Sequence, residues 1–235
     1  TGNNQTYKLN FIQIFGKLKL AATHSTGLRN PSLYELYGSD NYGIGGNPNL
    51  KPEKSETNEI YGEYNFSEKL KFTSTAYRTE ISDRIESNAA YSRHENQLIS
   101  LNQEGLESEL LLSVNDQVFR LFTNFSKSRK TNGAGQARRP DLSYGGSYSK
   151  KFESSIAGSF DLDLFYKHTG KFIDYNGSIN TPQKSTDLLD LSIKKDWFGS
   201  IISINISNLL NERYEKPATY SQDGRKFSLN FKKTY

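Results

Sequence analysis

Phe-Asp-Leu-Asp-Leu-Phe-Tyr-Lys, residues 160–167, carries an apolar side chain at every second position and decides the fold class. Successive side chains of a β-strand point to opposite faces of the sheet, so this spacing gives the strand a continuous apolar face. The same period of two recurs in residues 189–193, 202–206 and 227–231. No stretch shows the 3.6-residue apolar stripe of a packed helix. The pattern predicts an all-β protein, with Leu162 and Asp163 on opposite faces.

The connections between the predicted strands alternate in length. Eleven strands of about ten residues, the length that crosses a membrane, are expected near residues 7–15, 17–25, 56–66, 70–81, 104–114, 118–127, 142–151, 156–168, 186–195, 200–208 and 225–235. Short turns alternate without exception with long polar stretches at residues 26–55, 82–103, 128–141, 169–185 and 209–224. Bacterial outer-membrane barrels have short periplasmic turns and long extracellular loops. The sequence therefore predicts a transmembrane antiparallel β-barrel, although a passive porin or a soluble carbohydrate-binding β-protein would share part of this pattern.

The composition agrees with a barrel and excludes several other classes. Hydrophobic residues make up 34% of the 235 residues and aromatic residues 13%, so no apolar run is long enough for a membrane helix. In a barrel only alternate strand residues face lipid, and this modest content is sufficient. The absence of Cys excludes disulfides and a Cys nucleophile. The net charge of +4 comes from scattered basic residues, so no nucleic-acid partner is expected.

The short-turn ends of the strands carry aromatic and lysine side chains. The aromatic residues are Phe15, Phe66, Phe152, Trp197, Phe198 and Tyr235. Lysines lie beside them, as expected where side chains reach the lipid headgroups. Single-chain bacterial barrels have an even number of strands and end in the periplasm. Eleven strands ending at Tyr235 then require an odd number before Thr1, so residues 1–235 are expected to be the C-terminal half of a larger barrel.

Two pairs of motifs resemble the TonB-dependent outer-membrane receptors. Residues 27–38 (Gly-Leu-Arg-Asn-Pro-Ser-Leu-Tyr-Glu-Leu-Tyr-Gly) and 46–55 (Gly-Asn-Pro-Asn-Leu-Lys-Pro-Glu-Lys-Ser) resemble the family's loop segment. Residues 208–215 and 224–227 resemble its C-terminal pair of motifs. The matching residues are Arg29, Pro31, Glu35, Tyr37, Gly38, Asn47, Pro48, Pro52, Glu53, Asn208, Tyr214, Gly224, Arg225, Phe227 and the terminal aromatic Tyr235, where the family usually has Phe.

The resemblance implies a barrel of about 22 strands whose lumen is filled by an N-terminal plug outside these residues. It implies an outer-membrane receptor of Gram-negative bacteria that binds a scarce large nutrient at its extracellular loops and imports it with energy relayed by TonB. The implied partners are the TonB complex, outer-membrane lipid, the barrel-assembly machinery at the C-terminal strand, and a small-molecule or chelate ligand. Loop spacing is most similar to that of the vitamin B12 (cobalamin) receptor branch. Siderophore receptors share the same motifs and remain the alternative.

The loops, and not a catalytic centre, hold the candidate site. Tyr37, Tyr42, Phe172 and Tyr175 are aromatic residues of two long loops, and aromatic faces suit a large flat ligand. The Pro-rich run at residues 47–53 is better explained as a stiff return of the loop to the next strand than as a ligand contact. His24, His94 and His168 lack ligand spacing, and no nucleophile elbow occurs, so no metal, cofactor or enzymatic activity is expected.

Overall fold

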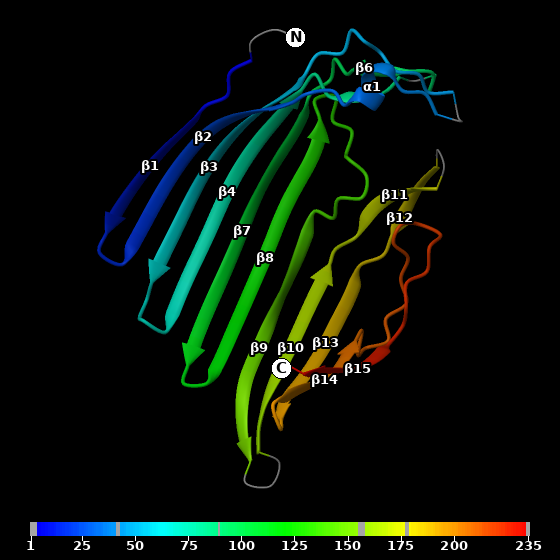
Figure 1. Cartoon of the computed structure of the whole chain (residues 1–235). Coiled ribbons are helices and arrows are strands. Elements are labelled where there is room, and N and C mark those ends of the chain that lie inside the picture. Colours follow the sequence, from blue (N-terminus) through cyan, green and yellow to red (C-terminus); the bar gives the residue numbers. More distant parts are fainter. Residues whose placement is uncertain (1–3, 41–42, 89, 155–157, 177–178, 234–235) are drawn as a thin grey trace.

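The protein is a single large antiparallel sheet with small elements in its long loops. The computed structural model describes residues 4–40, 43–88, 90–154, 158–176 and 179–233. Eleven strands pair in the order β1-β2-β3-β4-β7-β8-β9-β10-β13-β14-β15 (Figure 1). Their bounds are β1 Lys8–Phe15, β2 Leu18–Arg29, β3 Glu53–Asn65, β4 Leu70–Ser82, β7 Leu101–Val114, β8 Gln117–Lys130, β9 Leu142–Ser154, β10 Gly158–Thr169, β13 Thr186–Trp197, β14 Ser200–Ser207 and β15 Lys226–Lys233. Every neighbouring pair in the sheet is antiparallel, as predicted.

All eleven predicted strands are present, and most of the differences lie toward the long loops. β2 and β3 continue through Arg29 and from Glu53, each several residues further than the alternation indicated. The long loops also contain five elements that were not predicted: α1 Leu33–Tyr37, the hairpin of β5 Ile85–Ser87 with β6 His94–Asn96, and the hairpin of β11 Phe172–Asn176 with β12 Ile179–Gln183. These pieces are too short to have a readable period. Figure 1 shows the short turns at one end of the sheet and these loop elements at the other.

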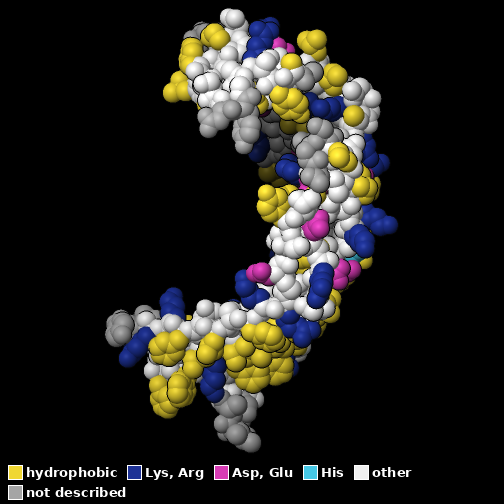
Figure 2. Space-filling view, turned by 90° about the vertical axis from the view of Figure 1, so that its right-hand side faces the viewer, with side chains coloured by type: hydrophobic (Ala, Val, Ile, Leu, Met, Phe, Trp, Pro, Cys, Tyr) yellow, Lys and Arg dark blue, Asp and Glu magenta, His cyan; other side chains and the backbone are white. Residues whose placement is uncertain are grey.

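The strand register collects the apolar side chains on one face, which we call the apolar face. Ile204 lies between Ile193 and Leu229, and Leu162 is the partner of Ile193. The other face, the polar face, carries Asp163 beside the Lys194 ammonium at 3.0 Å. Along β3 the apolar-face positions are exposed and the polar-face positions are half-buried, as expected if the sheet curves with its polar side inward. The space-filling view shows the corresponding crescent, hollowed on one side (Figure 2).

On the polar face, aromatic side chains lie over glycines of the neighbouring strand. Tyr77 is the register partner of Gly105, and a Cβ at Gly105 would lie 2.6 Å from the Tyr77 hydroxyl oxygen. Phe122 and Phe165 stack with ring centroids 6.0 Å apart, and Gly145 lies beside them. A Cβ at Gly145 would lie 2.8 Å from the Phe122 ring. These glycines give the inward rings room that no other residue would leave.

Aromatic side chains ring the short-turn end, as the sequence predicted. Phe15 and Trp197 are exposed there on the apolar face, and Phe66, which follows β3, is exposed with its ring against that of Tyr64. Phe152 stacks on Phe160 with centroids 5.1 Å apart, and the Lys150 ammonium lies 4.6 Å from the Phe152 ring. The terminal Tyr235 lies outside the described residues.

The buried apolar side chains lie in or beside the long loops and not in the middle of the sheet. Among the described residues they are Leu50, Ile85, Leu101 and Ala218. The sheet itself is a single layer that no other described element covers, and the packed material is at its long-loop end. No helix in the described part of the chain is long and apolar enough to span a membrane.

Candidate functional site in the long loops

Ion pairs join the two ends of the loop between β2 and β3. The Arg29 guanidinium donates from Nε and Nη2 to the two Glu53 carboxylate oxygens, both at 2.7 Å. It also lies 3.1 Å from the Glu35 carboxylate in α1. Glu53 accepts a further bond, from the Ile85 amide at 2.7 Å, which ties β5 to the same point. Paired charge-assisted bonds of this kind fix orientation as well as distance.

The short helix α1 is defined by its N-terminal cap. The Ser32 hydroxyl accepts from the Glu35 amide at 3.2 Å, and the Glu35 carboxylate accepts from the Ser32 amide at 2.7 Å. This reciprocal capping box is a sequence signal that the period-based prediction passed over. Burial raises the pKa of the Glu35 carboxyl, but hydrogen bonds from Ser32 and Arg29 outweigh it and hold the pKa below its ordinary value.

Two motif glycines let the chain cross itself just after α1. A Cβ at Gly38 would lie 2.3 Å from the Tyr34 ring, and one at Gly46 would lie 2.6 Å from the Leu36 carbonyl. The Gly46 amide donates to the Gly38 carbonyl at 2.7 Å. Asn47 follows, and its backbone amide donates to the Glu35 carbonyl at 2.8 Å. The glycines are therefore required by the close approach of backbone to backbone.

The β5–β6 hairpin docks on this crossing and joins two long loops into one unit. The Asn47 side-chain amide donates to the His94 carbonyl at 3.0 Å. Asn96 exchanges hydrogen bonds with the Lys51 backbone, at 2.8 Å and 2.9 Å. Pro48 and Pro52 lie within the segment that these bonds hold, Pro48 exposed and Pro52 half-buried. We call the unit formed by residues 29–40, 43–53, 83–88 and 90–100 the first loop cluster.

A buried carboxylate holds a second cluster together. Asp174 of β11 is 1% exposed. Its carboxylate accepts from the Arg138 guanidinium, and from the Ala218 and Tyr175 amides at 2.7 Å each. The Arg138 guanidinium, followed by the two backbone amides, holds the pKa of this carboxyl below its usual range against the effect of burial. Because Asp174, Arg138 and Ala218 come from three different loops, this one carboxylate fixes the second loop cluster, defined as residues 131–141, 170–176, 179–183 and 209–225.

The C-terminal motifs meet at the base of the last long loop. The Asn208 side chain accepts from the Glu212 amide and donates to the Glu212 carbonyl, both at 2.8 Å. The Arg225 amide donates to the Asn211 carboxamide oxygen at 3.0 Å, and the Arg225 guanidinium donates to the Leu209 carbonyl at 2.9 Å. The other matched residues lie nearby, with Gly224 beside Asn211, Tyr214 half-buried, and Phe227 on the apolar face of β15.

The aromatic residues proposed to contact ligand fall into separate clusters. Tyr37 is 72% exposed at the end of α1 in the first loop cluster. Phe172 and Tyr175 lie on β11 in the second loop cluster, where Tyr175 is 45% exposed and Phe172 is half-buried. Tyr42 lies outside the described residues. Tyr37 and the β11 pair belong to different loop clusters, so any shared ligand would have to span both.

The residues that sequence reasoning missed are those that tie loops together. Asp174 lies between Phe172 and Tyr175, the two predicted aromatic contacts, but it is 36 positions from Arg138. No local sequence signal connects Asp174 with Arg138. The Arg84 side chain, buried next to β5, pairs with Glu86 at 2.7 Å. In the described part of the chain no three His, Asp or Glu side chains gather as a metal cluster. His168 instead pairs with Asp187 at 2.8 Å.

Comparisons with known proteins agree with this architecture. The family described as "TonB dependent receptor-like, beta-barrel" matches residues 1–209. The vitamin B12 transporter BtuB of Vibrio cholerae serotype O1 is 26% identical over 235 residues, covering 98% of this chain and 36% of the relative. The chain thus spans about a third of the length of the curated relatives it matches.

Solved structures share the fold at low sequence identity. The siderophore receptor PirA from Acinetobacter baumannii superposes with a TM-score of 0.81 at 16% identity, over 100% of this chain and 41% of that one. The FrpB iron transporter from Neisseria meningitidis gives a TM-score of 0.77 at 14% identity, over 98% and 39%. Because the family model matches residues 1–209, the chain belongs to the TonB-dependent receptor family of outer-membrane β-barrels, whose members are receptors and transporters and not enzymes.

Proposed function

We propose that residues 1–235 form the C-terminal half of a barrel of about 22 strands that imports a scarce large nutrient across the outer membrane of a Gram-negative bacterium. The observation that carries this proposal is the pair of tied loop clusters above a polar inner wall. A receptor that captures a ligand before transport needs a preorganised mouth, because ordering loops at the moment of binding lowers affinity. A passive pore needs no such organisation of its loops.

Cobalamin is the proposed nutrient. In support, the vitamin B12 transporter of Vibrio cholerae aligns with 98% of this chain. Tyr37 in the first loop cluster, Phe172 and Tyr175 in the second, and Tyr42 are proposed to contact the corrinoid. Their rings would pack against its flat faces. The structures of siderophore receptors are similar at 14–16% identity, which concerns the fold and leaves the ligand open.

The proposed partners follow from this assignment. The plug and the segment that engages the TonB complex are assigned to sequence outside residues 1–235, and the barrel-assembly machinery is assigned to the C-terminal strand. The motif residues other than Tyr37 are proposed to be structural, as Arg29, Asn47 and Asn208 are in holding the loops through hydrogen bonds. Their roles are then independent of which nutrient is carried.

Uptake in cells tests the proposal. Cells that carry the complete gene should accumulate labelled cobalamin, and a protonophore should abolish the accumulation. A ferric siderophore is the parallel substrate. Siderophore uptake without cobalamin uptake would assign the receptor to the alternative class, and uptake that survives the protonophore would contradict active transport altogether.

A further inference from the structure

A group of polar side chains lies on the apolar face where β10 and β13 approach their long loops. Tyr166 and His168 continue this face of β10 beyond Leu164, and Asp187 of β13 is the register partner of His168. The Tyr166 hydroxyl donates to the Asp187 Oδ1 atom at 2.5 Å, and the His168 Nδ1 atom lies 2.8 Å from the same oxygen. Three side chains from two neighbouring strands therefore converge on one point.

Tyr144 of β9 completes this group. It is the register partner of His168 on the other side of β10, and its ring stacks on the imidazole with centroids 4.6 Å apart. Its hydroxyl is close enough to the Tyr166 hydroxyl for the two groups to interact. The side chains of Tyr144 and Asp187 are both partly exposed, so the group is accessible from outside the sheet. We call Tyr144, Tyr166, His168 and Asp187 the rim cluster.

The rim cluster lies at the long-loop edge of the apolar band. Asp187 is the second residue of β13, and the apolar side chains of Leu189, Leu191 and Ile193 follow it toward the short turn. Because the long loops of such barrels are extracellular, the rim cluster faces the outside of the cell. It points away from the lumen, so its role is independent of the nutrient that the loops capture.

The four side chains of the rim cluster suit a hard metal ion with octahedral coordination. Phenolate and carboxylate groups are anionic oxygen donors, and an imidazole nitrogen binds iron, copper, nickel or zinc. At a metal–ligand distance of about 2.0–2.1 Å, neighbouring ligands of an octahedral ion are about 2.8–3.0 Å apart, and those of a tetrahedral ion about 3.3–3.4 Å. The spacings of 2.5 Å and 2.8 Å around Asp187 Oδ1 are nearer to the octahedral value. Ferric iron combines this geometry with affinity for anionic oxygen.

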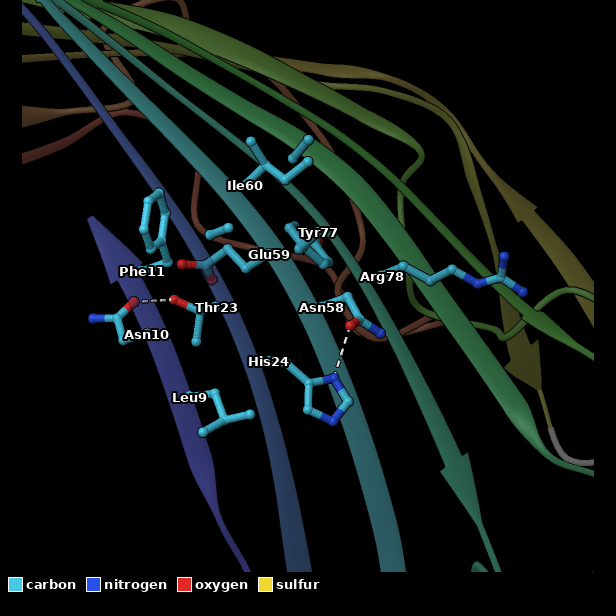
Figure 3. A pocket seen from close by; sticks show the side chains of 12 residues that line it. Leu9, Asn10, Phe11, Thr23, His24, Asn58, Glu59, Ile60, Tyr77 and Arg78 are labelled. Carbon is cyan, nitrogen blue, oxygen red and sulfur yellow. Dashed lines mark hydrogen bonds between the residues drawn. The ribbon is translucent and has the colours of Figure 1, made fainter. Parts of the chain in front are cut away.

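A second tyrosine–histidine pair on the same face shows what distinguishes the rim cluster. His24 lies in the groove across β1 to β4 that Figure 3 shows. Its Nε2 atom is 3.1 Å from the Tyr7 hydroxyl, and its Nδ1 atom is 2.8 Å from the Asn58 carboxamide oxygen, the bond dashed in Figure 3. Asn58 supplies a neutral carboxamide where the rim cluster has the Asp187 carboxylate. His24 is therefore the matched control.

We propose that the rim cluster binds a ferric ion, with the Tyr166 phenolate, the His168 imidazole and the Asp187 carboxylate as ligands and the Tyr144 phenolate as a fourth. The remaining octahedral positions are filled by water or by the oxygens of a chelator. The tyrosines lose their hydroxyl protons when they bind the metal, so the affinity falls as the pH is lowered. Because the ligands come from β9, β10 and β13, the bound ion ties three strands together at the rim of the barrel.

Titration of the complete receptor in detergent with ferric nitrilotriacetate, followed by visible absorption, tests the site. A phenolate bound to ferric iron gives a charge-transfer band that iron held by carboxylates or lipid phosphates does not give. Wild-type receptor should develop this band and saturate at equimolar iron, and the double variant Tyr144→Phe/Tyr166→Phe should lose it. Asp187→Asn and His168→Ala should weaken iron binding by more than about tenfold, since even the loss of an outer-shell partner costs that much. His24→Ala should titrate as wild type does.

Stability gives a second measurement. Iron should raise the urea midpoint of wild type and of His24→Ala, because a ligand that binds only the folded protein stabilises it, and it should not change that of Asp187→Asn. Heat modifiability on a gel shows that each variant is folded before the titration. Wild-type receptor without the band, or an unchanged band in the double tyrosine variant, would overturn the site. Tighter binding of zinc than of ferric iron at the same residues would overturn the choice of metal.

Discussion

Placing an arginine at Ile204 tests which face of the sheet meets lipid. Ile204 is the middle one of three isoleucines on the apolar face of β14, with Ile202 and Ile206 on either side. Across the sheet it meets Ile193 and Leu229. It therefore lies near the centre of the apolar band, where a charged side chain has no polar neighbour to turn to.

The expected cost follows from that position. An arginine on the lipid face at the midplane costs about 2–4 kcal/mol. Ile204 is 47% exposed, so replacing it removes about half of the contacts that a fully buried isoleucine would make. That loss adds roughly another 1 kcal/mol to the cost. The sum of roughly 3–5 kcal/mol corresponds to a change of about 10²–10⁴ in the folding equilibrium constant.

Ser203→Arg is the matched control, because it places the same side chain one residue away on the polar face. Its neighbours across the sheet are Lys194 and Asn230. Repulsion from Lys194 in a watery lumen should cost under about 1 kcal/mol. Folding of the complete receptor into lipid vesicles at increasing urea, read by heat modifiability on a gel, should show a large midpoint shift for Ile204→Arg and a small one for Ser203→Arg. Equal shifts, or a larger shift for Ser203→Arg, would refute the assignment of the faces.

Three further predictions concern the loops and the inward glycines. Glu53→Gln should destabilise the first loop cluster by about 1 kcal/mol, a value kept small because Arg29 is half exposed to solvent. Hydrogen exchange at the Ile85 amide should become faster in this variant. It should not change in the control variant Glu95→Gln. Asp174→Asn should release the second loop cluster, seen as faster exchange at the Ala218 amide. Because the pKa of Asp174 is lower in the folded state than in the unfolded state, its stabilisation is present above about pH 4 and lost as the pH falls further; loss of protection already at pH 6 would contradict this. Gly145→Ala should block barrel assembly, because the new Cβ would lie 2.1 Å from the Tyr166 carbonyl oxygen. The control Gly62→Ala should assemble, because its Cβ would meet only the Leu20 side chain at 3.7 Å. Outer-membrane fractionation would show which variants assemble.

The alternation in residues 160–167 predicted the strands because it is a local property with a physical cause. A strand with lipid on one side and water on the other must alternate, and each strand carries that signal within itself. The long-loop ends of β2 and β3 were missed because residues such as Thr26 and Lys54 are polar on the apolar face, above the lipid, where alternation stops while pairing continues. The same reasoning explains why short hairpins such as β11–β12 left no pattern to read.

Loop ties are invisible in the sequence for a different reason. Arg29 and Glu53 are 24 positions apart, and Asp174 and Ala218 are 44 apart. Arg29, Glu53 and Asp174 are ordinary polar residues in polar stretches until the barrel brings the strand ends together, and Ala218 takes part only through its backbone amide. The family motifs pointed to the first pair, because both of its members belong to a recognisable segment. Nothing comparable marked Arg138 and Asp174.

The contacts of the motif residues also bear on where ligand recognition lies. The side-chain amides of Asn47 and Asn208 donate to the backbone carbonyls of His94 and Glu212, and the Arg29 guanidinium pairs with two carboxylates. A side chain whose donors are already bonded within the loop has little left with which to distinguish one nutrient from another. Tyr37 and Tyr175, in contrast, are exposed on loops that those bonds hold in place. If discrimination resides in such rings, Tyr37→Ala should weaken ligand binding and leave the loops folded, whereas Asn47→Ala should loosen the loops and weaken binding only as a consequence.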